Sequence, residues 1–282
     1  MVKFIVKSET SLREQVQEWR RAGESIGFVP TMGALHKGHL SLVEKVKEHA
    51  SKIVASIYVN PTQFAQGEDL DSYPRQVKKD AAMLKAAGCD LVYTPDNMYA
   101  PNHTTSVTVK GPALGLETEY RPHFFGGVAL IVTKLFNRVQ PDIAVFGEKD
   151  YQQFLTIKHL TKDLDMPVRI IGAPIMREPD GLAMSSRNAY FDKQGRKIAG
   201  QLNVIMRACA KDIKNGSTIK TATDKAAQAL REAGFESVDY VALADAGSLK
   251  LLSGKLRTKH ARLLIAATCK GVRLIDNCGY ER

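Results

Sequence analysis

Two histidines three residues apart are the residues whose type and spacing most directly indicate chemistry. His36 and His39 belong to the stretch 30–39, which follows the apolar run 26–29 and precedes a segment, 40–50, whose apolar residues recur at near-helical spacing. This order predicts a strand, a tight glycine-containing loop and a helix. Free N–H groups and the helix dipole favour anions at a helix N-terminus, and side chains three residues apart share a face. We therefore predict a nucleotide-phosphate site here.

A lysine follows a later apolar run in the same way. Residues 142–146 are predicted to form an inner strand, and the polar loop 147–153 after it carries Lys149 and Asp150. Lys149 can reach phosphate oxygens as a point charge, while Asp150 can hold a ribose hydroxyl, a metal-bound water or a helix N-terminus. Taken alone, an exposed lysine beside a capping aspartate is the simpler interpretation.

Two further polar loops extend the pattern. The two serines and the arginine of 185–187 end a loop punctuated by proline and glycine, and hydroxyls beside a guanidinium can wrap a triphosphate. Asn60 and Gln63 follow the apolar run 53–59, at a strand end where open α/β sheets place ligand-binding loops. A plain turn at Asn60 with a solvated Gln63 explains that second loop equally well.

The elements that must position these loops alternate between strand and helix. We predict strands at 26–29, 53–59, 90–94, 142–146 and 168–171, with amphipathic helices between them. Alternation of this kind predicts an α/β fold with a parallel sheet. The first helix is expected to begin at Ser11, whose spacing to Glu14 is that of a capping box. The long connection 95–127 is expected to be irregular, with a short strand at 106–110.

The character of the chain changes after the serine and arginine loop. Helices are predicted at 192–214 and 217–233, followed by strands at 238–243, 263–267 and 272–275. We interpret this part as a smaller α+β domain. The predicted domains are therefore 1–175 and 176–282, with the 185–187 loop in the second.

Composition limits the classes of function. The 282 residues are 44% hydrophobic with a net charge of +10, and no apolar run approaches the ~20 residues of a membrane span. No signal peptide is recognisable, so we predict a cytoplasmic protein without a membrane partner. The four cysteines lack metal-binding spacing, so we expect reduced thiols and no metal site. The basic residues are dispersed, so polyanionic small substrates or an ordinary basic surface explain the charge better than nucleic acid does.

Together, the loops resemble the two signatures of nucleotidylyltransferases and class I aminoacyl-tRNA synthetases. Within that superfamily the chain is similar to the pantothenate synthetase family, in the order and spacing of stretches 29–39, 59–64, 68–69, 73–75, 134–137, 147–153, 180–188 and 273–277. The resemblance implies a Rossmann-like parallel-sheet nucleotidylyltransferase domain that binds ATP and pantoate, and a smaller α+β C-terminal lid domain. It implies ATP-dependent condensation of pantoate with β-alanine through a pantoyl-adenylate, releasing AMP and diphosphate, with Mg²⁺ and as a homodimer.

The resemblance also implies roles for individual residues. Catalysis falls to His39, as proton donor, together with His36 and Lys149. The ATP-binding set implied is Met32, Gly33, His36, His39, Gly147, Lys149, Asp150, Met176, Met184, Ser185, Ser186 and Arg187, with Met176 meeting the adenine through its backbone. The substrate-binding set is Gln63 and Gln153, which grip pantoate, Asn60, which assists, and Tyr73, which borders the β-alanine site.

One loop departs from the family pattern. The chain has Arg-Pro-His-Phe-Phe-Gly-Gly-Val at 121–128, where the family usually has Arg-Pro-Gly-His-Phe-Arg/Asp-Gly-Val. We favour a simple repacking by Phe124 or Phe125 over a changed pantoate pocket and changed dimer packing. The alternatives to the ligase are a cytidylyl- or adenylyltransferase and, ranked last, a basic RNA-binding protein that kept a nucleotide fold.

Overall fold

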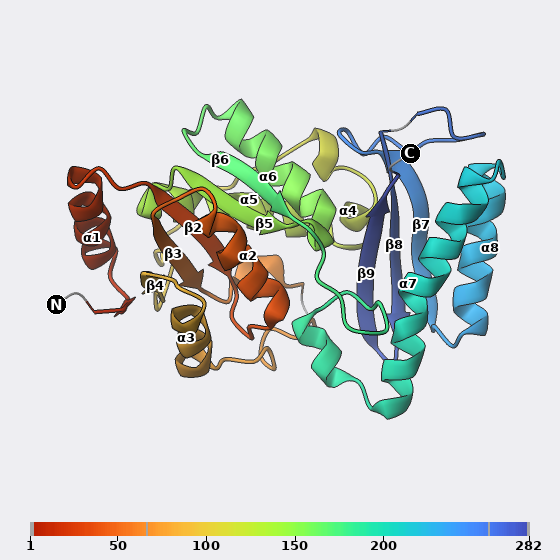
Figure 1. Cartoon of the computed structure of the whole chain (residues 1–282), viewed down its shortest axis with the longest axis horizontal. Coiled ribbons are helices and arrows are strands. Elements are labelled where there is room, and N and C mark those ends of the chain that lie inside the picture. The colour runs from red at the N-terminus through yellow and green to blue at the C-terminus, as the bar shows by residue number, and fades with distance from the viewer. Residues whose placement is uncertain (1–2, 66, 259, 281–282) are drawn as a thin grey trace. The chain divides into compact units, whose positions relative to one another are not determined.

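The computed structural model describes residues 3–65, 67–258 and 260–280 (Figure 1). It divides into two compact units. The first unit comprises Met1–Ala113, Glu117–Glu148 and Gln153–Pro174, and the second Leu114–Leu116, Lys149–Gln152 and Ile175–Arg282. The functional boundary predicted between residues 175 and 176 stays a prediction.

The first unit is built on a parallel sheet, which confirms the predicted fold class. Its strands run in the order β1-β4-β3-β2-β5-β6. Their bounds are β1 Ile5–Val6, β2 Ile26–Thr31, β3 Lys52–Ile57, β4 Leu91–Tyr93, β5 Ile143–Gly147 and β6 Arg169–Ala173. Successive strands progress outward on one side of β2, and the chain then returns to place β5 on the other side. The carboxyl ends of β2 and β5 therefore flank the topological switch point, where ligands bind in open α/β sheets.

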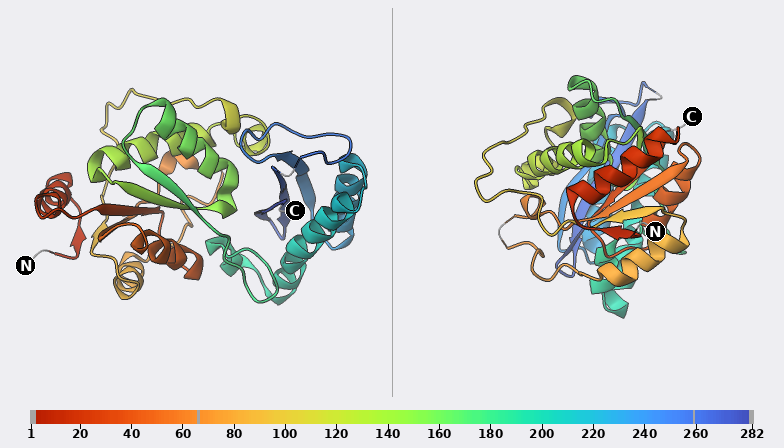
Figure 2. Two further views of the ribbon diagram at one scale, coloured as in Figure 1. Left: turned by 45° about the horizontal axis from the view of Figure 1, so that its top comes forward. Right: turned by 90° about the vertical axis from the view of Figure 1, so that its left-hand side faces the viewer.

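Helices cover both faces of this sheet. They are α1 Glu9–Arg21, α2 Lys37–Lys47, α3 Val77–Ala86, α4 Glu117–Tyr120, α5 Phe124–Val139 and α6 Tyr151–Asp163, of which Tyr151 and Gln152 group with the second unit. Figure 2 shows α2 and α3 on one face of the sheet and α5 and α6 on the other. Because both faces are covered, β2, β3 and β5 are almost entirely apolar and buried.

Helix α2 packs unusually close to β2, at Gly27. A Cβ on Gly27 would lie 2.5 Å from Val46 Cγ2 and 2.9 Å from Ala50 Cβ. We therefore expect Gly27→Ala to destabilise the protein by about 1–3 kcal/mol, seen as a lower Tm in scanning calorimetry. Gly126→Ala is the matched control, because its added methyl meets only the Val107 carbonyl oxygen at 3.4 Å. Equal Tm values for the two variants would contradict the expectation.

Two local predictions in this unit are wrong. The cap of helix α1 lies three residues earlier than expected, because the Ser8 hydroxyl, and not that of Ser11, caps the helix by accepting the Ser11 N–H at 3.1 Å. Residues 106–110 form no strand. Their alternating pattern is suitable for a strand, but a strand also needs a sheet edge to pair with, and both sheets use other segments.

The second unit has the predicted α+β character. Helices α7 Lys193–Lys214 and α8 Ile219–Glu232 pack on an antiparallel sheet of β7 Ser237–Asp245, β8 Ala261–Cys269 and β9 Val272–Gly279, in that order. The core between helices and sheet contains Leu202, Met206, Leu230, Leu263 and Ile265, all nearly inaccessible to solvent. No described helix of either unit is long and apolar enough to cross a membrane.

The four cysteines are free thiols, and three are buried. Burial raises the pKa of the Cys89 and Cys209 thiols to about 12. Since only the thiolate reacts readily, we expect these two to resist a disulfide reagent at pH 8 in the native protein, and all four to react in guanidinium. Burial raises the pKa of both thiols in the folded protein above the unfolded value of ~8.5. The contribution of these neutral thiols to the free energy of unfolding is therefore fully present below pH ~8.5 and declines above it. Rapid labelling of native Cys89, located by mass spectrometry, would contradict this assignment.

Candidate nucleotide site

The two histidines cap the helix whose start they occupy. Helix α2 begins at Lys37, with His36 as its N-cap. Nδ1 of His36 accepts the Gly38 N–H at 3.1 Å, Nδ1 of His39 accepts the His36 N–H at 3.3 Å, and the ring centroids are 4.1 Å apart. The N–H groups of Gly38 and His36 are therefore bonded to the imidazoles, so this helix start has fewer free N–H groups than predicted. Binding of an anion here stays a prediction.

The same caps determine which nitrogen of each ring carries the proton. A neutral imidazole that accepts a hydrogen bond at Nδ1 carries its proton on Nε2. Each ring therefore carries a proton on Nε2, and the two rings are held in a fixed relation by backbone hydrogen bonds. Contact of the two rings with a phosphate stays a prediction.

A buried carboxylate that sequence analysis missed shapes the loop before the histidines. Asp80 of α3 is inaccessible to solvent and accepts the N–H groups of Ala34 at 2.9 Å and Leu35 at 3.0 Å. A Cβ on Gly33 would lie only 3.0 Å from its Oδ2, so the left-handed Gly33 also permits this approach. The available signal was the position of Asp80, a charged residue four positions before Leu84 on the buried face of an amphipathic helix.

Asn60 uses its whole side-chain amide inside the protein. Its Nδ2 donates to Gln63 Oε1 at 2.9 Å and to the Gly127 carbonyl at 3.3 Å, while its Oδ1 accepts from Thr62 Oγ1 at 3.1 Å and Tyr99 OH at 2.7 Å. Asn60 therefore orients Gln63, and because Oε1 of Gln63 is occupied, its NH₂ group is the end available to a ligand. Direct contact of Asn60 with a substrate stays a prediction.

The atypical loop is held by an arginine. Arg121 forms a two-pronged ion pair with Glu68, at 3.0 and 2.9 Å, and donates to the Gln63 carbonyl at 2.9 Å. The Phe124 ring lies 4.0 Å from the Arg121 guanidinium carbon, and Phe125 is 3% exposed. Both phenylalanines thus pack within the first unit, against or beside the arginine that holds Gln63. Their effect on a pantoate pocket stays a prediction.

Gly127 lets α5 approach the Gln63 turn. A Cβ there would collide with the Thr62 carbonyl oxygen, so only glycine fits this contact.

The remaining predicted residues of the first unit occupy defined places. Tyr73 is buried with its ring 5.7 Å from that of Phe64, in a small cluster that includes Met32. Gly147 ends β5, and Gln153 lies in the first turn of α6.

The second unit carries the other predicted ATP residues. Lys149 lies 3.8 Å from the Asp150 carboxylate, and its backbone carbonyl accepts the Asn277 side-chain amide at 2.9 Å. Ser185 caps the short helical turn Ser186–Tyr190 by accepting the Arg187 N–H at 3.3 Å. The Met184 N–H donates to the Met176 carbonyl at 2.9 Å, which closes the loop between them. Within this unit, Met176, Met184 and Ser185–Arg187 thus belong to one folded loop.

The charged residues of the described chain form no cluster of three or more histidine, cysteine, aspartate or glutamate side chains suited to a metal ion. The ligand roles of all predicted site residues stay predictions. Residues missed by sequence analysis are Asp80, which accepts the Ala34 and Leu35 N–H groups, and Tyr99, which donates to Asn60. Both are distant in the sequence from the residues they contact.

A parallel sheet with helices on both faces and two paired imidazoles beside its switch point defines a Rossmann-like α/β protein. A sequence model of the pantoate–β-alanine ligase family matches residues 4–279. The chain belongs to this family, which confirms the predicted resemblance.

Curated relatives and solved structures agree with this assignment. A pantothenate synthetase of Maricaulis maris is 51% identical over 270 residues, covering 95% of this chain and 93% of the relative, and one of Caulobacter vibrioides is 48% identical over 277 residues, covering 97% of each. The crystal structure of pantothenate synthetase from Thermus thermophilus superposes with a TM-score of 0.92 at 40% identity, covering 99% of this chain and 100% of that one. A Francisella tularensis pantoate–β-alanine ligase, complexed with β-γ ATP and β-alanine, has a TM-score of 0.83 at 30% identity, covering 99% and 98%.

Proposed function

We propose that this protein condenses pantoate with β-alanine at the expense of ATP, through a pantoyl-adenylate, releasing AMP and diphosphate. The observation that carries the proposal is the family match over residues 4–279, which includes every segment predicted to hold a substrate. The name and ligands of the Francisella tularensis relative support the same substrates.

In the first half-reaction, an oxygen of the pantoate carboxylate attacks the α-phosphorus and diphosphate leaves. The carboxylate is ionised at neutral pH, so the attack needs no general base. The protein must orient the reactants and stabilise developing negative charge. The Nε2–H donors of His36 and His39 would do this from the start of α2, with Lys149 and Ser185–Arg187 contributing further cations and hydroxyls.

In the second half-reaction, the β-alanine amine attacks the acyl carbon of the adenylate. The new C–N bond forms as the bond from the acyl carbon to the phosphate oxygen breaks, the amine nitrogen loses a proton to solvent, and AMP leaves. Gln63, held by Asn60 and Arg121, would position the pantoyl group by donating its NH₂ hydrogens. Gln153 would contact the same group, and Tyr73 would border the β-alanine site.

ATP would contact Met32, Gly33 and Met184, its adenosine would lie near Gly147 and Asp150, and its adenine would meet the backbone of Met176. Mg²⁺ would accompany ATP, since it binds mainly to substrate phosphates with one or two carboxylates, and the partly exposed Asp150 is one carboxylate of its loop. Bound Mg²⁺ neutralises part of the phosphate charge. We further propose a cytoplasmic homodimer with no nucleic-acid partner, and sedimentation analysis measures the oligomeric state directly.

Product analysis tests the proposed reaction. Incubation with ATP, Mg²⁺, pantoate and β-alanine is expected to yield pantothenate, AMP and diphosphate in equal amounts. Without β-alanine, pantoate alone should support exchange of labelled diphosphate into ATP, because the adenylate forms reversibly. Absence of both exchange and pantothenate would contradict the proposal, and transfer of a nucleotide to a phosphate-bearing acceptor would favour a nucleotidylyltransferase.

A further inference from the structure

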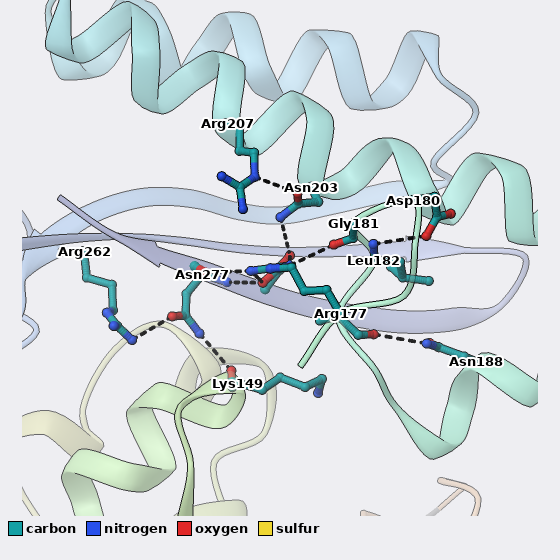
Figure 3. Close-up of polar contacts among 12 residues, drawn as sticks. Lys149, Arg177, Asp180, Gly181, Leu182, Asn188, Asn203, Arg207, Arg262 and Asn277 are labelled. Atoms are coloured by element: carbon teal, nitrogen blue, oxygen red, sulfur yellow. Dashed lines mark hydrogen bonds and ion pairs between the residues drawn. The ribbon is translucent and has the colours of Figure 1, made fainter. Parts of the chain in front are cut away.

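Two adjacent residues near the end of the last strand reach two of the segments proposed to hold ATP. Asp276 and Asn277 of β9 are each 2% exposed. Nδ2 of Asn277 donates to the Lys149 carbonyl at 2.9 Å, and its Oδ1 accepts from Arg262 at 2.8 Å (Figure 3). Because a guanidinium only donates, Arg262 determines that the NH₂ end of Asn277 faces Lys149.

The segment Lys149–Gln152 has further contacts with Arg262 of β8 and with Ala246, which follows β7. The guanidinium carbon of Arg262 lies 3.6 Å from the centre of the Tyr151 ring, and the Tyr151 hydroxyl donates to the Ala246 carbonyl at 2.8 Å. Arg262 therefore orders both the amide that holds Lys149 and the ring two residues further on. These contacts determine where the backbone that carries the Lys149 side chain lies.

Asp276 acts on the loop 177–187 through Arg177. Its carboxylate, inaccessible to solvent, forms a two-pronged ion pair with Arg177 at 2.7 and 2.9 Å and accepts from Asn203 at 3.2 Å. Arg177 also donates to the Gly181 carbonyl at 3.0 Å and pairs through its backbone with Ala183. The loop that begins at Arg177 is thus closed on itself immediately before Ser185–Arg187.

Stability alone is a weak explanation for this arrangement, since a buried ion pair is often no more stabilising than apolar residues of the same size. The contacts end instead on backbone carbonyls of Lys149 and of the 177–183 loop. We infer that Asp276 and Asn277 are positioning residues for the proposed ATP site, Asn277 acting through Lys149 and Asp276 through Arg177. The inference rests on the proposed function.

The first test follows Asn277. Asn277→Ala is expected to weaken binding of a non-hydrolysable ATP analogue, measured by calorimetry, about tenfold or more, since small displacements of a binding group cost this much. Asp239→Asn is the matched control, because it breaks the 2.7 Å Arg273–Asp239 ion pair in the same sheet. In a Lys149→Ala background, Asn277→Ala should have little further effect, because its action passes through Lys149. A loss no greater than that of the control, or additive losses in the double variant, would overturn the assignment.

The second test follows Asp276 and uses a variant that keeps the buried charge. Arg177→Lys retains a cation but loses the two-pronged geometry, and it is expected to raise the KM for ATP about tenfold with a smaller change in kcat. Asp276→Asn should have the same effect or a larger one if it folds. An unchanged KM for ATP in Arg177→Lys would overturn this half of the inference. If the unsubstituted protein makes no pantothenate yet the analogue-binding results hold, the proposed reaction fails and the positioning role stands.

Discussion

Replacing His39 with alanine is expected to lower the rate of pantoate-dependent adenylate formation by about 10²- to 10³-fold, the usual cost of removing one donor from a developing oxyanion. The reason is geometric. His39 accepts the His36 N–H at Nδ1, which places its proton on Nε2 as a donor beside the matching donor of His36. The measurement is exchange of labelled diphosphate into ATP without β-alanine.

The control for this variant lies just beyond the other end of the same helix. His49→Ala removes an imidazole that is part-exposed near Glu48 and is expected to keep exchange within about twofold. Loss of the His39 cap should cost about 1 kcal/mol of stability, so circular dichroism must show that the variant is folded at the assay temperature. Near-normal exchange in folded His39→Ala would remove this residue from the mechanism.

Gln63→Glu is expected to lower kcat/KM for pantoate by about 100-fold while changing the KM for ATP little. The substitution keeps the shape of the side chain and its ability to accept from Asn60 Nδ2. It replaces the outward NH₂ donor with an oxygen and adds a negative charge facing a carboxylate substrate, so attraction becomes repulsion.

The matched control is Gln17→Glu, which makes the same chemical change at an exposed position of α1. Initial rates at varied pantoate and at varied ATP separate the two effects. A variant with an unchanged KM and kcat for pantoate would show that Gln63 does not contact this substrate. In that case the Asn60 and Arg121 contacts would serve the fold of the turn alone.

Much of the architecture followed from local pattern. The strands at β2, β3 and β5 and the helices α7 and α8 were located within a few residues, because hydrophobic periodicity and capping residues act over one or two turns of chain. The local pattern predicted the wrong helix cap where two nearby serines were equally good candidates. Ser8 and Ser11 are both good caps, and only the packing of the helix selects between them.

By itself, the sequence determined the family, the parallel sheet and the loops that carry His36, Lys149 and Arg187, since these depend on residue type and spacing. Tertiary structure decided how those loops are held. Asp80 reaches Leu35 across 45 residues, and Arg177 reaches Asp276 across 99. Such hydrogen-bond partners depend on strand order and register, which no short stretch of sequence encodes. The buried polar groups must nevertheless find partners, and the folded chain supplies them from distant elements.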